Sequence, residues 1–225
     1  MSTLMPFQAD GVAWLKANPT GLLADEPGLG KTIEIAMALD AGKPALVVCP
    51  AFLKTNWVRE LAKWRPDLRA QALYGRDSLV APEPGQVLVT NYAILSDGPD
   101  LKPDTQLVAD ECQALAATGT KQSRRFKALS RRAAGTWGAS GTPYRNSTLD
   151  LWGIATAMGW AGQAFGNMSR FLWLFRGTKL HHGGYVFGRP RDEGLAAIKP
   201  FILRRLRAEV LPQLPERTYH DIEIE

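Results

Sequence analysis

The sequence predicts an α/β protein built on a parallel sheet, and two observations carry that prediction. Over the first 150 residues, short apolar runs alternate with helix-like patterns, which is typical of strands joined by helical crossovers. The apolar runs are continuous, as in strands buried on both faces. The chain has 225 residues, 45% of them hydrophobic and 22% charged, a composition that excludes disordered, collagenous and coiled-coil proteins.

Each expected strand is a short apolar run followed by a polar or turn-forming residue. The six strands are Gly21–Ala24, Ala45–Cys49, Gln71–Tyr74, Val87–Asn91, Gln106–Ala109 and Thr136–Ser140.

Three helices are expected between these strands, at Lys31–Ala41, Lys54–Arg65 and Lys121–Ala134. The first contains neither Gly nor Pro and is followed by Gly42 and Pro44, which are stop signals. The second repeats Trp57, Leu61 and Trp64 at helical spacing, so we expect Trp57 to be a core residue. The third has a narrower apolar stripe, and its arginines therefore face solvent or a partner.

The residue pattern changes after residue 150. Leu151–Trp160 and Phe171–Phe175 are aromatic and helical, and a Gly-rich stretch with His181 and His182 follows, which favours an exposed hairpin. Alternation returns in Tyr219–Glu225. We therefore expect an α/β core over 1–150, a helical and Gly-rich appendage over 151–200, and a closing segment over 201–225.

Positive charge is concentrated in one part of the chain. The formal net charge is +5, and Cys112–Leu149 contains no Asp or Glu. The cations of this stretch are Lys121, Arg124, Arg125, Lys127, Arg131, Arg132 and Arg145. This pattern fits either a polyanion partner or a merely solvated helix face.

The sequence disfavours disulfides, a structural zinc site, secretion and a membrane span. The two cysteines, Cys49 and Cys112, form no disulfide framework, and with the three histidines they show no metal-ligand spacing, so we expect no structural zinc. The N-terminus is not a signal peptide, and no apolar run is long enough for a membrane span. We expect an intracellular protein without a membrane partner, cytoplasmic if bacterial or phage and nuclear if eukaryotic.

The stretch GLLADEPGLGKTIEIAMAL has the order of a phosphate-binding loop: an apolar strand, a glycine turn, then Lys-Thr opening a helix. Backbone N–H groups at the glycines and the helix N-terminus bind phosphate oxygens, Lys31 reaches the terminal phosphates, and the Thr32 hydroxyl ligates Mg²⁺. Asp25 stands where the strict pattern has its first glycine. The expected nucleotide-binding residues here are Glu26, Pro27, Gly28, Leu29, Gly30, Lys31 and Thr32.

A carboxylate pair, Asp110-Glu111, follows the apolar run Leu107–Ala109. Ligands of open α/β sheets bind at the carboxyl ends of strands. We assign Asp110 to the metal and Glu111 to the attacking water, with Lys31 as the third catalytic residue. Taken alone, the pair also fits an acidic cap of the next helix.

Seven segments occur in the order found in the Swi/Snf-type ATPases of helicase superfamily 2, and they span nearly the whole chain. The family's glutamine motif is similar to MPFQADGVAWL, motif I to DEPGLGKT, motif Ia to ALVVCPAFLKTNW, motif Ib to VLVTNYAIL, motif II to DECQ, motif III and its helix to SGTPYRNSTLDLW, and the end of the first lobe to FILRRLRAEVLPQLPER. The resemblance implies a RecA-like first lobe that binds ATP and Mg²⁺.

The resemblance also implies roles for individual residues. Gln8 would hydrogen-bond adenine, with Phe7 or its neighbours stacking on the base. The residues implied to lie toward the nucleic acid are Lys54, Asn56, Thr90, Asn91 and Tyr92. Those implied to couple the nucleotide site to lobe motion are Gln113, Ser140, Gly141 and Thr142. Motif II ends here in Cys112-Gln113 where the family commonly has Ala-His.

Members of this family hydrolyse ATP between two RecA-like lobes, the second supplying arginines, and no segment here matches that lobe. The resemblance places Arg204 and Arg205 behind the first lobe, which disfavours them as arginine fingers. The resulting expectation is the ATP-binding lobe of a double-stranded-DNA translocase that needs a second lobe in cis or trans and is weakly active alone.

Two alternatives remain. A small-molecule kinase would use His181, His182, Arg189 and Arg191 as its lid. A non-catalytic interaction module would keep the fold without the reaction.

Overall fold

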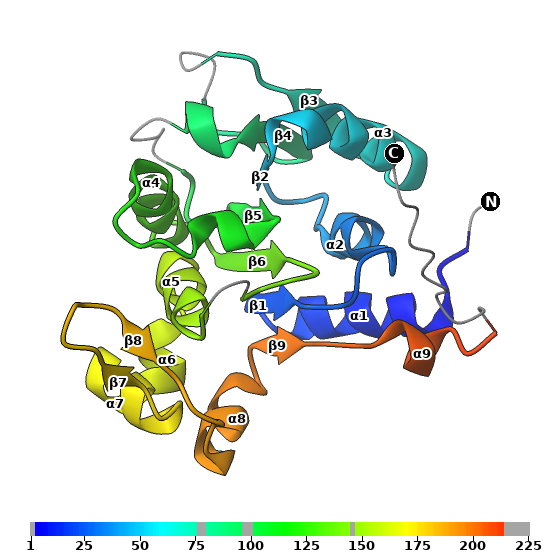
Figure 1. The fold of residues 1–225 in the computed structure, drawn as a ribbon. Helices are drawn as coiled ribbons and strands as arrows, with labels where there is room; N and C mark the ends of the chain where they lie inside the picture. Colours follow the sequence, from blue (N-terminus) through cyan, green and yellow to red (C-terminus); the bar gives the residue numbers. More distant parts are fainter. Residues whose placement is uncertain (1–2, 76–79, 96–100, 145–146, 214–225) are drawn as a thin grey trace, which may run out of the picture.

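The computed structural model describes residues 3–75, 80–95, 101–144 and 147–213, and its centre is a parallel sheet (Figure 1). Within these residues the sheet has seven strands in the order β3-β4-β2-β5-β6-β1-β9, and every neighbouring pair is parallel. The strands are β1 (Thr20–Leu23), β2 (Ala45–Cys49), β3 (Arg69–Ala72), β4 (Gln86–Asn91), β5 (Gln106–Asp110), β6 (Gly135–Ala139) and β9 (Ile202–Leu203).

Helices cover both faces of the sheet. The helices α1 (Pro6–Ala17), α2 (Lys31–Ala38) and α3 (Lys54–Trp64) share one apolar cluster with every second strand residue, such as Leu23 and Val47. The helices α4 (Lys121–Ser130) and α5 (Leu149–Ala157) share the other cluster with the residues between, such as Leu22 and Leu46. The continuous apolar strands therefore have a core on each side.

The remaining elements form an appendage beside α5 (Figure 1). They are α6 (Ala161–Phe165), α7 (Met168–Leu174), β7 (Thr178–Lys179), β8 (Tyr185–Val186) and α8 (Asp192–Ile198), after which come β9 and α9 (Arg207–Val210). Aromatic packing joins the appendage to the sheet, since the rings of Trp160 and Phe201 are stacked at 5.0 Å. His181 and His182 are exposed between β7 and β8.

The predicted parallel α/β architecture is confirmed, while the bounds of several elements differ; the helix expected at Lys121–Ala134, for example, ends at Ser130. The strand expected at Gln71–Tyr74 lies at Arg69–Ala72, because this edge strand is only half-buried and carries no apolar run. The first crossover helix ends at Ala38, where Leu39 turns to an extended conformation. The two-residue strand β9 is too short to show periodicity, and the alternating segment Tyr219–Glu225 lies outside the described residues.

Among the residues that the structure describes, single-turn helices of 3₁₀ type follow three sheet strands, at Ala51–Leu53, Tyr92–Ile94 and Cys112–Leu115. They carry the chain away from the carboxyl ends of β2, β4 and β5. None of the helices in the described part of the chain combines the length and the apolar character needed to cross a bilayer.

Candidate functional site

The glycine turn after β1 forms a loop that wraps the N-terminus of α2. Gly28 and Gly30 have φ values of 88° and 89°, which glycine adopts without strain. Gly30 is the N-cap of α2, and a Cβ there would lie 2.4 Å from the side-chain nitrogen of Gln8. Both glycines are therefore required by the local backbone, and the free N–H groups of the first helical turn lie at the loop.

Lys31 is held inside this loop. Its Nζ donates to the carbonyls of Asp25 and Glu26 at 2.7 and 3.1 Å. Burial lowers the pKa of Lys31, while the nearby acids Asp25, Glu111 and Asp110 oppose that shift. The ammonium group is thus positioned beside the α2 N-terminus, where an anion is stabilised.

A cavity of about 740 Å³ lies at the carboxyl edge of the sheet and joins the segments singled out in the sequence. It brings together the loop, the carboxylate pair and motif III, which are far apart along the chain. The predicted site residues that line it are Pro27, Gly28, Gly30, Lys31, Thr32, Asn56, Asp110, Glu111, Gln113, Gly141 and Thr142. The kinase-lid candidates His181, His182, Arg189 and Arg191 are not among the residues that line it.

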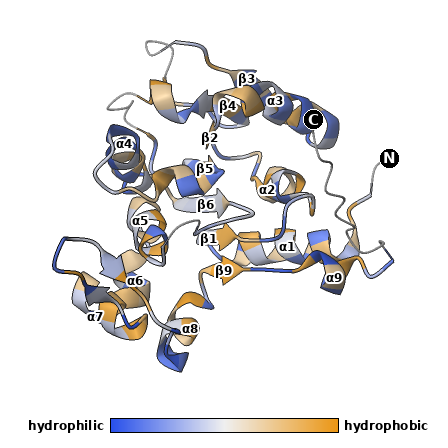
Figure 2. Ribbon diagram, viewed as in Figure 1, coloured by the Kyte–Doolittle hydropathy of each residue, from blue (hydrophilic) through white to orange (hydrophobic). Residues whose placement is uncertain are grey.

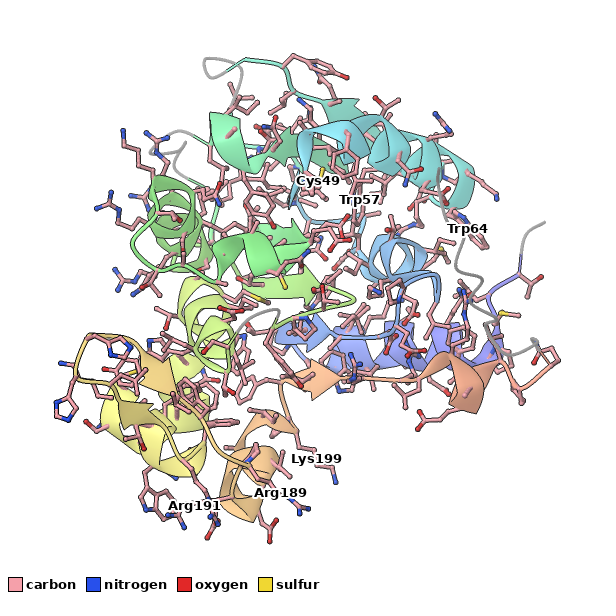
Figure 3. All side chains as sticks on the ribbon, in the orientation of Figure 1. Cys49, Trp57, Trp64, Arg189, Arg191 and Lys199 are labelled. Atoms are coloured by element: carbon pink, nitrogen blue, oxygen red, sulfur yellow. The ribbon has the colours of Figure 1, made fainter. Side chains whose placement is uncertain are left out.

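Asp110 ends β5 and is 7% exposed. Its Oδ2 accepts a 2.7 Å hydrogen bond from the indole Nε1 of Trp57, and its Oδ1 accepts from the backbone N–H of Glu111. The Tyr92 hydroxyl donates to the Asp110 carbonyl at 2.7 Å. Burial raises the pKa of Asp110, and the Trp57 hydrogen bond counteracts it. Figure 3 labels Trp57 beneath α3, on the side of the sheet.

Glu111 adopts a left-handed conformation with φ 49°, unusual for a residue with a side chain. Its Oε2 accepts from the Gln113 amide at 2.6 Å, and the Gln113 carbonyl oxygen accepts from the Ser140 hydroxyl at 2.7 Å. The Ser140 hydroxyl also accepts from the Thr142 N–H at 3.1 Å. Four side-chain and backbone groups thus form one chain from the second carboxylate to motif III.

A buried ion cluster lies behind the loop. The guanidinium of Arg205 binds Asp25 and, at 2.7 Å, Glu34, and it also donates to the Phe7 carbonyl. Both carboxylates are 0% exposed. Burial raises the pKa of Glu34 to about 7, although Arg205 lowers it. Arg204 donates to the Ala24 carbonyl, so Arg204 and Arg205 both lie behind the loop.

The two residues implied for the adenine base lie close to the loop. The Gln8 amide donates to the Leu29 carbonyl at 3.1 Å, and its oxygen accepts from the Met5 N–H. Phe7 is 9% exposed and lies 5.3 Å from the Arg205 guanidinium. These contacts join the glutamine motif to the nucleotide loop.

The five residues implied to face nucleic acid do not share one surface. Lys54 is 5% exposed, and its Nζ donates to the Leu73 carbonyl and lies 4.1 Å from the Tyr74 ring centroid. Thr90, Asn91 and Tyr92 are likewise buried. Asn56 alone of the five lines the cavity. The side chain of Lys54 is therefore directed into the fold.

Sequence patterns missed several residues of the site. Asp25 was expected only as a departure from the loop pattern, yet it is a buried ligand of Arg205. Trp57 is fully buried as expected, but its indole also orients Asp110. The position of Asp25, a charged residue directly after an apolar strand, could have marked it as part of the site. No local pattern could have shown that it pairs with Arg205, which lies 180 positions away.

The donor set of the cavity fits a hard divalent cation. The Thr32 hydroxyl and the carboxylates of Asp110 and Glu111 all line it, and Mg²⁺ prefers oxygen donors. No group of three or more His, Cys, Asp and Glu side chains forms an all-protein metal cage in the described residues.

Comparison with known proteins gives a consistent result. The model of the SNF2-related domain family matches residues 7–225. The chain is 31% identical to Helicase ssl-1 of Caenorhabditis elegans, over 96% of this chain and 10% of that protein. It is 32% identical to the putative ATP-dependent helicase/translocase YwqA of Bacillus subtilis, over 96% of this chain and 25% of that protein.

A solved structure resembles the fold over most of the chain. It is the Sulfolobus solfataricus SWI2/SNF2 ATPase core in complex with dsDNA, with a TM-score of 0.74 and 29% identity, over 92% of this chain and 45% of that one. The seven-stranded sheet thus matches the RecA-like fold of that core. The chain spans less than half the length of each of these proteins.

Proposed function

The chain belongs to the SNF2-related domain family, and we propose that it is the ATP-binding first lobe of a double-stranded-DNA-dependent ATPase and translocase. The observation that carries the proposal is the single cavity that gathers the phosphate loop, Asp110, Glu111 and motif III at the carboxyl edge of the sheet. The family membership and the names of its helicase relatives support ATP as the nucleotide.

Each side chain has a role that its position supports. Lys31 binds the terminal phosphates, and the α2 N-terminus adds its backbone N–H groups. Thr32 and Asp110 hold Mg²⁺, which neutralises phosphate charge when bound. Glu111 orients and deprotonates the attacking water. Gln8 and Phe7 do not line the cavity, and their proposed place on the adenine side of the site rests on the family resemblance rather than on their position.

The polar chain from Glu111 through Gln113 to Ser140 supports a coupling role for motif III. Gln113 occupies the position where the family commonly has His, and its amide can donate to one partner while its carbonyl accepts from another. A change at Glu111 is thereby transmitted to Ser140, Gly141 and Thr142.

Double-stranded DNA is the proposed nucleic-acid partner, and a SWI2/SNF2 core of the same fold was solved with dsDNA. Because Lys54 is buried, we propose that Asn56 and backbone groups near Thr90, Asn91 and Tyr92 contact the DNA instead. Contacts to phosphates make such binding salt-dependent and little dependent on sequence.

Full hydrolysis is proposed to require a second RecA-like lobe, in cis or trans. Arginines opposite the γ-phosphate contribute much of the rate in such enzymes. Arg204 and Arg205 are directed behind the loop, away from that role. We place the protein inside the cell, where ATP and DNA are available.

The test measures ATP binding by calorimetry and steady-state ATPase activity with Mg²⁺, with and without double-stranded DNA. We expect ATP binding with little DNA-stimulated turnover. Lys31→Ala should abolish binding because it removes the phosphate cation, and Glu111→Gln should retain it. Absence of ATP binding in the wild-type chain would refute the proposed function, and strong DNA-stimulated turnover would refute the need for a second lobe.

A further inference from the structure

The exposed face of α4 carries a row of cations. Lys121, Arg124, Lys127 and Arg131 follow one another at intervals of three or four residues, the last of them directly after the helix. At about 100° per residue, these positions fall within an arc of about 120°. The opposite face is Ser123, Phe126 and Leu129, which are buried against the sheet side.

Lys121, Arg124 and Arg131 are exposed and Lys127 is partly exposed, so the row is accessible to a partner. None of them makes a side-chain hydrogen bond or an ion pair to the residues that the structure describes. Acidic residues are absent from Cys112–Leu149, so none along this stretch neutralises them. Figure 2 shows α4 as strongly hydrophilic, and in Figure 3 nitrogen-tipped side chains project outward from it.

The surface on both sides of this row is hollowed. Lys121 and Arg124 line a shallow groove of about 350 Å³. Lys127 and Arg131 line a second groove, of about 250 Å³, whose other wall is formed by α5 and the glycines after it. An extended polyanion can therefore approach the row more closely than it would a convex helix.

The α4 face adjoins the segment proposed to meet DNA. The Arg125 guanidinium donates to the Leu95 carbonyl at 2.7 Å, and Leu95 ends the 3₁₀ turn that follows β4. This contact fixes the first half of α4 beside motif Ib. A duplex that passes the Leu95 end of motif Ib therefore lies near α4, the helix that carries the cationic row.

The dimensions match a DNA strand. From residue 121 to residue 131 the row spans about 15 Å, at 1.5 Å per helical residue. One strand of duplex DNA carries a phosphate about every 3.4 Å of rise along the duplex axis, and the spacing along the winding strand is longer, so the four cations can contact at most about four phosphates.

We infer that the cationic face of α4 is a second phosphate-contacting surface, which binds the backbone of the duplex beyond the segment on motifs Ia and Ib. The inference rests on the proposed function, since it assigns to the same DNA an additional contact. Lys121, Arg124, Lys127 and Arg131 are the residues that make it.

The test replaces all four residues with glutamine (K121Q, R124Q, K127Q, R131Q) and measures affinity for a duplex against salt concentration. A matched control replaces four exposed cations of the appendage (R176Q, K179Q, R189Q, K199Q), which removes the same charge. Figure 3 labels Arg189 and Lys199 near α8, in the appendage.

We expect the α4 variant to flatten the slope of log K against log salt by about 3 to 4, at about 0.9 per phosphate, and the control to change it by less than about 1. Between about 50 and 200 mM salt, the wild type should then lose roughly 100-fold more affinity than the α4 variant. Lengthening the duplex should strengthen binding by the wild type more than by the α4 variant.

The outcomes separate the two proposals. If the α4 variant binds duplex DNA as tightly as the wild type and shows the same salt slope as the control variant, the α4 inference is overturned. The proposed function then stays intact. A wild-type chain that binds ATP but shows no affinity for duplex DNA at low salt overturns both DNA assignments. Unchanged ATP affinity and circular dichroism in the α4 variant show that a lost slope is not a folding defect.

Discussion

Replacing Arg205 with methionine should be among the most destabilising single substitutions in this chain. The Arg205 side chain is 11% exposed and binds two carboxylates, Asp25 and Glu34, that are both 0% exposed. Methionine fills a similar volume but leaves both acids without a cation. Removing one partner of a buried ion pair typically costs about 3 to 5 kcal/mol, against a total stability of about 5 to 15 kcal/mol.

The assay is equilibrium unfolding in urea at pH 8, followed by circular dichroism. Lys102→Gln is the control, because its ion pair with Glu83 is largely exposed, at 41% and 61%, and should cost about 1 kcal/mol or less. Arg205→Lys keeps the charge but loses the planar fork, so its cost should be intermediate. If Arg205→Met costs no more than the control, the cluster does not stabilise the loop.

Three further predictions concern the same region. Glu34 has a folded pKa of about 7 against an ordinary 4.5, so its own contribution to stability should be fully present below about pH 4.5 and should be lost, by about 3 kcal/mol, as pH rises to about 7. Glu34→Gln, still facing Arg205, Asp25 and Lys31, should remove that decline, and an unchanged pH profile by urea unfolding would exclude Glu34 as its source. Trp57→Phe removes the indole donor to Asp110 and should weaken ATP binding in the presence of Mg²⁺ about 10-fold. ATP binding in EDTA should stay the same, and equal weakening under both conditions would indicate a general packing defect. Gly30→Ala places a Cβ 2.4 Å from the Gln8 amide at a φ of 89°, so nucleotide affinity by calorimetry should fall by at least 10-fold, and wild-type affinity would show that the loop tolerates the change.

Local sequence patterns were sufficient to predict the strands of the sheet, the glycine loop and the position of Asp110. Continuous apolar runs such as Ala45–Cys49 predict strands because a strand buried on both faces has no polar side. The loop from Gly28 to Thr32 was readable because its glycines, lysine and hydroxyl residue are adjacent in sequence. Asp110 was assigned because an acid at the end of an apolar strand lies at the edge of the sheet where the phosphate loop also lies; without that loop the pair would equally fit a helix cap.

Contacts between distant residues could not be read in the same way. Lys54 lies one turn from Trp57 on α3, and a helical pattern alone does not show that its ammonium turns inward to Leu73. The pairing of Arg205 with Asp25 depends on β9 joining β1, and a two-residue strand leaves no periodic signal. Such pairings are decided by tertiary packing, which overrides local preference.

The junction of β9 with β1 also bears on the order in which the molecule assembles. Asp25 and Arg205 are 180 residues apart, and closing so long a segment carries a large entropic cost before its contacts repay it. During synthesis from the N-terminus, β1 and the loop leave the ribosome long before Arg205 does. Until β9 docks, Asp25 is a carboxylate without its cation, so the phosphate loop reaches its final form only when almost all of the described chain has been made.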